Sequence, residues 1–148
     1  MAQLIPTSAK GKLAYYAGLP AANDALIWVL FTGTETDDNL RDADTLAAVI
    51  ALAVDEATFT GYTRQAATGV TVTVDDTGND ILVDANDPSW NPTSVQALSR
   101  IGLFYDPDTT TGTDADLIPL FFDDYALSTP SSGIVGYTVA AGGFYKAA

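Results

Sequence analysis

The stretch that decides the fold is Asp55–Asp106, DEATFTGYTRQAATGVTVTVDDTGNDILVDANDPSWNPTSVQALSRIGLFYD. Within it, Val70–Val74 alternates valine with threonine, which is typical of a strand with one apolar and one hydroxylated face. The polar turn Asp75–Asp80 interrupts this alternation and Ile81–Val83 resumes it, which predicts a β-hairpin. The run Val95–Tyr105 is long enough to cross a sheet. These patterns favour an antiparallel β domain over a scaffold of alternating strands and helices.

The rest of the chain adds strands and a few helical signals. Apolar runs predict strands at Ala25–Thr32, Leu117–Phe122 and Ile134–Ala140. Pro119 cannot donate a ladder hydrogen bond, so its strand should lie at a sheet edge or contain a bulge. Apolar spacing behind capping residues predicts the main helix over Thr45–Ala53. We therefore predict a mainly β fold, an antiparallel β sandwich or barrel with one or two short helices.

The length of 148 residues suits one compact domain with a sizeable core. We expect residues 1–20 to form an N-terminal arm with a short helix over Lys10–Gly18. Residues 21–148 should form a single β domain, and Gly142-Gly143 should let its C-terminal tail bend away. Because no apolar run reaches the about 18–20 residues that a bilayer requires, we expect no membrane partner.

The chain contains neither cysteine nor histidine. A Ser-His-Asp triad, an imidazole base and structural zinc are therefore excluded by composition. We predict a protein that is not an enzyme and that has no catalytic residues, no cofactor and no metal.

The chain carries 19 acidic and 6 basic residues, a net charge of −13. Nucleic acid is bound through clustered Lys and Arg, whereas the bases here are few and scattered. We therefore expect no nucleic-acid partner. The alternative is that the charge only keeps the surface solvated. The bases are Lys10, Lys12, Arg41, Arg64, Arg100 and Lys146.

Acidic residues cluster in the predicted turns, for example at Asp75-Asp76, Asp106/Asp108 and Asp114/Asp116. Oxygen ligands of this kind suit calcium. The EF-hand spacing fails, however, because the twelfth position of a loop that starts at Asp106 is Leu117 rather than Glu. Asx residues also favour tight turns for conformational reasons, which is the interpretation that we prefer. A catalytic carboxylate pair is the third alternative.

Aromatic residues are spread over the predicted strands, where they should fill a β core. The alternative for this set is a carbohydrate-binding surface. The residues concerned are Trp28, Phe59, Tyr62, Trp90, Phe104, Tyr105, Phe121, Phe122 and Tyr137.

The two ends of the chain combine aromatic rings with positive charge in an otherwise acidic protein. They are our candidates for partner contacts, because an acidic partner would repel the remaining surface. The alternative is that the aromatic rings pack over an open end of a barrel. The candidate residues are Lys10, Lys12, Tyr15, Tyr16, Phe144, Tyr145 and Lys146.

Several motifs resemble a family of small structural proteins of tailed-bacteriophage virions, which includes capsid decoration and minor head proteins. An E-x-x-x-x-GY-x-R element precedes paired strands, a D-A-x-D-x-x-W turn and a strand that ends in Tyr-Asp. The matching residues are Glu56, Gly61-Tyr62, Arg64, Asp84-Ala85-Asn86-Asp87 with Trp90, Tyr105-Asp106, and the later Leu117-Ile118 and Asp123. The resemblance spans roughly two thirds of the chain. It departs at the start, where the family's basic, helix-forming opening is reduced to Ala9–Leu13.

The resemblance implies a non-enzymatic virion protein that is made in the host cytoplasm. Its most specific implication is a capsid decoration or cement protein that binds the major capsid protein, or other virion proteins, on the outer head surface. It also implies a homo-oligomer, with threefold clustering. The alternatives are a tail, head–tail connector or fibre-like attachment protein, and, from a third class, a carbohydrate-binding protein or glycosidase. Gly61–Arg64 has a simpler structural interpretation as a bend in which Arg64 pairs with Glu56 or a nearby Asp.

Overall fold

The computed structural model describes residues 4–9, 12–20, 22–78 and 80–147, with side chains described up to Tyr145. Strands dominate this part of the chain, and every strand pair is antiparallel. The mainly β fold predicted from the sequence is therefore confirmed.

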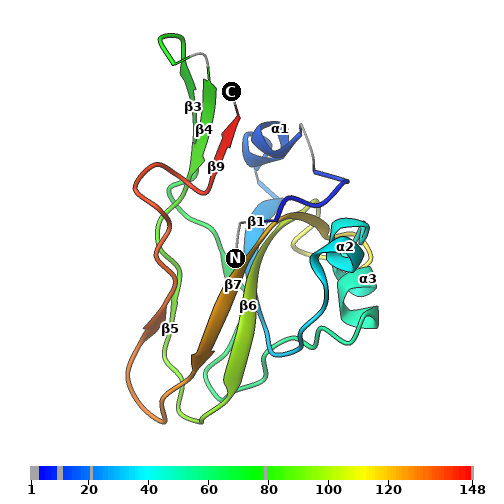
Figure 1. Ribbon diagram of the computed structural model, residues 1–148, viewed down its shortest axis with the longest axis vertical. Helices are drawn as coiled ribbons and strands as arrows, with labels where there is room; N and C mark the ends of the chain where they lie inside the picture. The colour runs from blue at the N-terminus through cyan, green and yellow to red at the C-terminus, as the bar shows by residue number, and fades with distance from the viewer. Residues whose placement is uncertain (1–3, 10–11, 21, 79, 148) are drawn as a thin grey trace.

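A central sheet has the strand order β2-β1-β6-β7 (Figure 1). Its members are β2 (Gln65–Ala66), β1 (Ala25–Phe31), β6 (Ala97–Asp106) and β7 (Ile118–Ser128). Three of the four lie where apolar runs predicted strands, because long buried strands read as nearly continuous apolar segments.

The expectation for Pro119 is confirmed on both counts. Its strand, β7, lies at an edge of the central sheet. The register passes from Leu103 opposite Phe121 to Phe104 opposite Pro119, so Leu120 is an extra residue in a bulge. The outer side of this edge is covered in part by Leu4, which exchanges two backbone hydrogen bonds with Phe122 at 2.8 and 2.9 Å.

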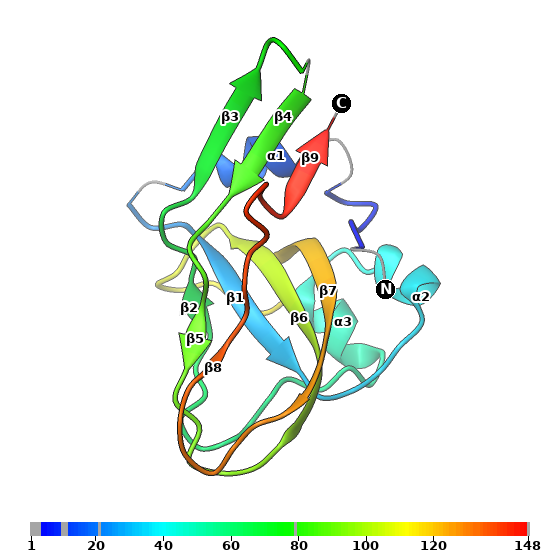
Figure 2. The same cartoon turned by 60° about the vertical axis from the view of Figure 1, so that its left-hand side comes forward.

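Apolar side chains pack on both faces of the central sheet. On one face, Phe31, Phe104 and Phe122 form a cluster with ring centroids 5.6–6.2 Å apart. Helices α2 (Asp37–Arg41) and α3 (Leu46–Ala51) cover that cluster (Figures 1 and 2). The other face carries a second cluster around Trp28 and faces the ribbon of β5 (Ser89–Trp90) and β8 (Val135–Gly136). The aromatic residues expected in the core are buried in one or the other of these two clusters, and Tyr62 packs half-buried against the Trp28 cluster.

Three short helices lie in the described part of the chain, where the sequence predicted one or two. The main predicted helix is α3, capped by Thr45, whose Oγ1 accepts a 3.1 Å hydrogen bond from the Ala48 amide. The short N-terminal helix is α1 (Leu13–Ala17). Helix α2 was not predicted from the sequence, and Thr36 supplies its cap by accepting from the Asn39 amide at 3.4 Å.

A smaller sheet stands out from one end of the body (Figure 2). It consists of β3 (Thr71–Asp75), β4 (Asp80–Asp84) and β9 (Tyr145–Ala147), in the order β3-β4-β9. The predicted hairpin is confirmed by β3 and β4, which pair without a register shift. We call the region formed by α1, β3, β4 and β9 the hairpin end.

The described parts of the predicted N-terminal arm, residues 4–9 and 12–20, pack on the domain, since Leu4, Ala9 and Leu13 are buried. The expectation that the tail bends away at its glycines is wrong. Gly143 has φ of +78°, and the turn there leads the chain back to pair as β9 beside β4. Of the strand predicted over Ile134–Ala140, the segment that pairs is Val135–Gly136, which forms β8.

Candidate functional site

The structure brings parts of both chain ends to the hairpin end, α1 with Tyr15 and Tyr16 and β9 with Tyr145. Helix α1 contacts β3 and β4, while β9 pairs with β4 on the side away from β3 (Figure 1). Segments that are more than a hundred residues apart in the sequence therefore lie side by side. This proximity makes the hairpin end the candidate interaction surface.

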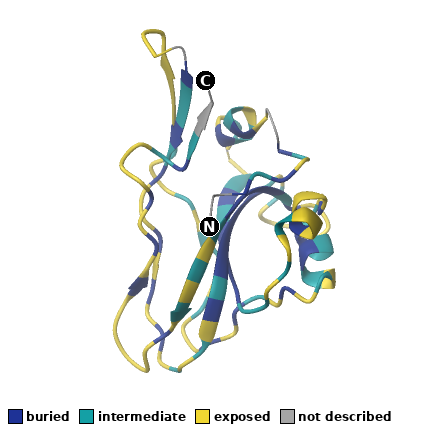
Figure 3. Ribbon diagram, viewed as in Figure 1, coloured by how far each residue is buried: buried dark blue, intermediate teal, exposed yellow. Residues whose placement is uncertain are grey.

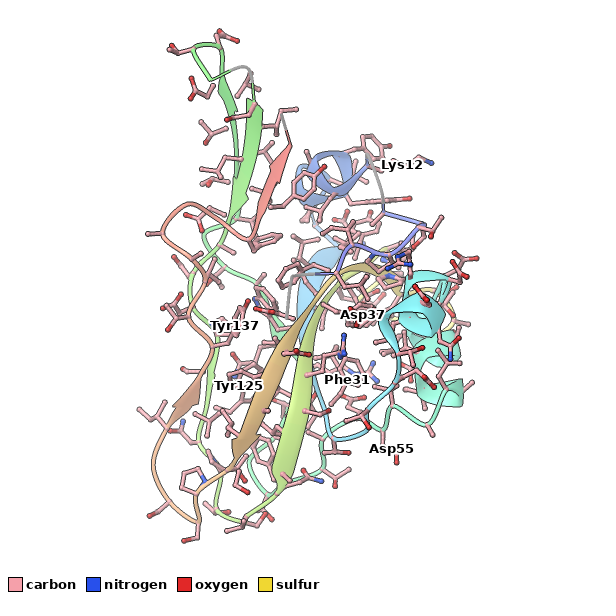
Figure 4. All side chains as sticks on the ribbon, in the orientation of Figure 1. Lys12, Phe31, Asp37, Asp55, Tyr125 and Tyr137 are labelled. Atoms are coloured by element: carbon pink, nitrogen blue, oxygen red, sulfur yellow. The ribbon has the colours of Figure 1, made fainter. Side chains whose placement is uncertain are left out.

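The N-terminal candidates differ in their accessibility. Lys12 is exposed at the start of α1 (Figure 4), and Tyr15 is 64% exposed. Tyr16 is half-buried against Tyr105, with ring centroids 5.3 Å apart. Lys10 lies outside the described residues. Lys12 and Tyr15 are thus the N-terminal residues that a partner can reach.

The C-terminal candidates are largely part of the fold. Phe144 is 1% exposed and packs between Trp28 and Phe121, at centroid distances of 6.0 and 5.5 Å. The ring fills a place in the core, which leaves Phe144 little surface for a partner contact. Tyr145 is partly buried opposite Val83, and the side chain of Lys146 lies outside the described residues.

Sequence reasoning missed the exposed valines of β3. Val74 is 65% and Val72 is 39% exposed, and all five residues of β3 are exposed (Figure 3). The alternation of valine and threonine was correctly interpreted as a strand. The alternation could not reveal that this strand stands clear of the body, so that its apolar face is left uncovered.

The other side of the same hairpin borders an open groove of 440 Å³. The groove is lined by Thr73, Val74, Asp75, Asp80, Leu82 and Gly142. Because Thr73 lies opposite Leu82 in the strand register, this side mixes hydroxyl, carboxyl and aliphatic groups. Both sides of β3 are therefore accessible.

Glu56 and Arg64 form a two-pronged ion pair away from the hairpin end. The Arg64 Nε and Nη2 atoms donate to the two carboxylate oxygens of Glu56 at 2.8 and 2.6 Å, and Nη1 donates to Asp114 at 2.7 Å. The Tyr62 hydroxyl donates to Glu56 at 2.7 Å and accepts from the Leu30 amide at 3.2 Å. Burial raises the pKa of Tyr62, and the hydrogen bonds to Glu56 raise the pKa of Arg64.

This network confirms the simpler interpretation of Gly61–Arg64 as a bend closed by an ion pair. Its charged groups satisfy one another, which is typical of a structural clamp between loops. The clamp ties the 56–64 segment to β1 through the Leu30 amide and to the loop that carries Asp114.

The role of a buried base, Arg100, escaped sequence reasoning. It lies on β6 between Asp37 of α2 at 3.3 Å and Asp124 of β7 at 3.4 Å (Asp37 is labelled in Figure 4). A buried charge that loses its partners is costly, so Arg100 helps to hold α2 on the central sheet. The signal in the sequence is a single arginine within an otherwise apolar strand.

The acidic residues of the loops support their own turns. Asp108 accepts from the amides of Thr110 and Thr111 at 3.0 and 3.2 Å, and Asp116 accepts from the amide and hydroxyl of Thr113, both at 2.8 Å. Hydrogen bonds from these threonines lower the pKa of both carboxyl groups. Across the described ranges, no group of three or more acidic residues is placed to hold a metal ion. These loops fit the turn interpretation.

Comparisons with family models, with curated proteins and with solved structures found no match. The helices that the structure describes have five or six residues, whereas about 20 are needed to cross a bilayer.

Proposed function

We propose that this chain is a non-enzymatic structural protein of a tailed-phage virion, and that it decorates the outer surface of the head. The proposal starts from the virion-protein motifs in the sequence. The protein acts by binding rather than by catalysis, and its hairpin end faces the particle.

The observation that carries the proposal is the distribution of charge around the hairpin end. Four basic side chains are described, and Arg41, Arg64 and Arg100 each pair with carboxylates. Among these four, Lys12 is the base without a carboxylate partner, and it lies one turn of helix from the exposed ring of Tyr15. An acidic partner surface would be attracted here and repelled by most of a chain of net charge −13.

The mechanism is stabilisation by binding. Exposed apolar side chains at the hairpin end would be buried against neighbouring capsid subunits, and charge complementarity would orient the contact. A protein that binds the assembled shell and not its separated subunits stabilises the shell by mass action. The acidic remainder of the surface would face solvent and away from DNA.

The experiment has two stages. Mass spectrometry and electron cryo-microscopy of purified particles should find the chain on the outside of the head. A position in the tail or at the head–tail junction would favour the connector or fibre-like alternatives, and absence from the particle would overturn the proposal. A saturable response in a glycan titration would favour the carbohydrate-binding alternative.

The second stage tests the surface with particles that lack this protein. The variants Lys12→Glu and Tyr15→Ala should each bind these particles more weakly than the wild-type chain. The matched control is Ile134→Ala, because Ile134 is 73% exposed but lies in the loop before β8, far from the hairpin end. If Lys12→Glu and Tyr15→Ala bind as tightly as the control, the contact lies elsewhere.

A further inference from the structure

The outer edge of β3 is an unprotected strand edge. In the order β3-β4-β9, β3 pairs with β4, and no described strand lies on its other side. All five residues of β3 are exposed, and Thr71–Val74 contains neither charge nor proline. Such an edge presents unpaired amide and carbonyl groups, which makes it a template for pairing with another strand.

The other free edges carry known protective devices. The edge strand β7 has Pro119, two register irregularities and the Leu4 bridge. The edge strands β2, β5 and β8 have only two residues each, and β9 has three. Because charges, prolines, bulges and short length are the usual means of blocking edge pairing, β3 stands apart as the edge left open.

We propose that β3 pairs in antiparallel fashion with β3 of a second copy of this chain. The register that aligns the whole strand with itself places Thr73 on a twofold axis, opposite Thr73 of the other copy. In this register, Val72 of one copy lies opposite Val74 of the other, and Thr71 lies opposite Asp75. The result is a continuous sheet with the strand order β9-β4-β3-β3-β4-β9.

The side-chain pattern fits a second copy better than an unrelated strand. Within one copy, Val74 lies opposite Ile81 and Val72 opposite Val83. Pairing in the proposed register therefore extends each valine pair into a row of four aliphatic side chains across four strands. Cross-strand apolar pairs of this kind stabilise sheets, and here each exposed valine would gain an aliphatic neighbour on the adjoining strand.

Charge also determines how two copies can approach. Each copy carries −13, but residues 69–74 are uncharged. The register keeps the two Asp75 carboxylates opposite Thr71 rather than opposite each other. Self-association through this edge should strengthen as salt screens the repulsion, whereas binding to a basic partner would weaken.

The chain lacks cysteine, so a single introduced thiol gives an unambiguous test. Residues directly opposite in an antiparallel pair have Cα atoms about 4.5–5.5 Å apart, within the range of a disulfide. Thr73→Cys should therefore form a disulfide-linked dimer under mild oxidation. The matched control, Thr34→Cys, is an exposed threonine between β1 and α2 and should stay monomeric.

The register has its own test. A mixture of Val72→Cys and Val74→Cys should form the mixed dimer, because these positions lie opposite each other. Each variant alone should cross-link poorly, because its two thiols sit on diagonal positions about 7–8 Å apart. Equal cross-linking in all combinations would overturn the register, and no Thr73→Cys dimer would overturn the pairing.

Sedimentation equilibrium of the unmodified chain tests the oligomer itself. A five-residue strand pair buries less than the about 1,200 Å² of a stable interface, so measurements should extend to about 1 mM protein. We expect twice the 15.5 kDa chain mass, with dimer increasing at high salt. Thr73→Lys and Thr73→Asp should both dissociate the dimer, because residue 73 of one copy lies opposite residue 73 of the other and two like charges repel. The control Thr34→Lys should leave the dimer intact.

A trimer, a monomer at every concentration, or a dimer that survives both Thr73 substitutions would overturn the inference. Because these experiments use the isolated chain, their failure would leave the proposed virion role standing. Absence of the chain from virions would leave the β3 pairing standing.

Discussion

The indole N–H of Trp90 donates a 2.8 Å hydrogen bond to the carbonyl oxygen of Thr63. Nearby, Gly61 approaches the next turn so closely that a Cβ atom there would lie 2.3 Å from the Asn91 carbonyl oxygen. The GY-x-R bend and the D-A-x-D-x-x-W turn therefore pack against each other in the structure, although they are separate motifs in the sequence.

Trp90→Phe should destabilise the protein by about 1 kcal/mol more than Trp28→Phe. Both rings are buried, but the Trp28 N–H has no hydrogen-bond partner among the described residues, so Trp28→Phe removes no hydrogen bond. Urea unfolding of both variants measures the difference. A larger loss for Trp28→Phe would mean that ring packing, rather than the Thr63 contact, dominates.

Gly61→Ala should be much more costly than Gly133→Ala. Both glycines have positive φ, +97° and +113°, so each substitution carries a conformational cost of about 1–3 kcal/mol. Only Gly61 adds a clash, because an added Cβ at Gly133 meets no atom within 4 Å. The difference in melting temperature between the two variants measures the cost of the clash at Gly61. Equal melting temperatures would contradict the prediction.

Arg64→Lys should cost about 1–2 kcal/mol of unfolding free energy, because lysine cannot reproduce the two-pronged contact with Glu56. The side chains are partly exposed, at 31% for Arg64 and 20% for Glu56, which limits the loss. Arg41→Lys is the control, since its pair with Asp38 is largely solvated, and it should stay within about 0.5 kcal/mol. A double-mutant cycle with Glu56→Gln measures the coupling, which should vanish if Arg64 acts only through its aliphatic stem.

Phe144→Ala should destabilise the chain by about 3–5 kcal/mol, because it empties a site in the core. Tyr15→Ala should change stability by about 0.5 kcal/mol or less, because its ring is exposed. Denaturant unfolding distinguishes a structural C-terminal ring from an accessible N-terminal one. A stable Phe144→Ala variant would revive a partner-binding role for Phe144.

Stability should fall as the pH rises above 10. Burial and the hydrogen bond to Asp24 raise the pKa of Tyr105 from 10.0 to about 12, and burial also raises the pKa of Tyr62. The unfolded chain then loses these protons at a lower pH than the folded chain, so the contribution is complete below pH 10 and declines toward pH 12. Urea midpoints at increasing pH measure the decline, and Tyr105→Phe should make it shallower. An unchanged slope in Tyr105→Phe would assign the decline to other groups.

The sequence alone determined the fold class and the places of its main elements. The signals that predicted these elements are local in the sequence. They are the alternation at Val70–Val74, the long apolar run that forms β6, and the cap at Thr45. Pro119 predicted an edge or a bulge because a missing N–H restricts its place in any sheet. Helix α2 escaped notice because five residues are too few to give a periodic pattern.

Only the tertiary structure decided which residues are accessible. Phe144 and Tyr15 look alike in the sequence, as aromatic residues near a terminus, yet one fills the core and the other faces solvent. The valines of β3 look like a buried face, yet they stand exposed on an open edge. Alternation records that a strand has two faces, but burial depends on what other segments of the chain place against each face, and those contacts are long-range.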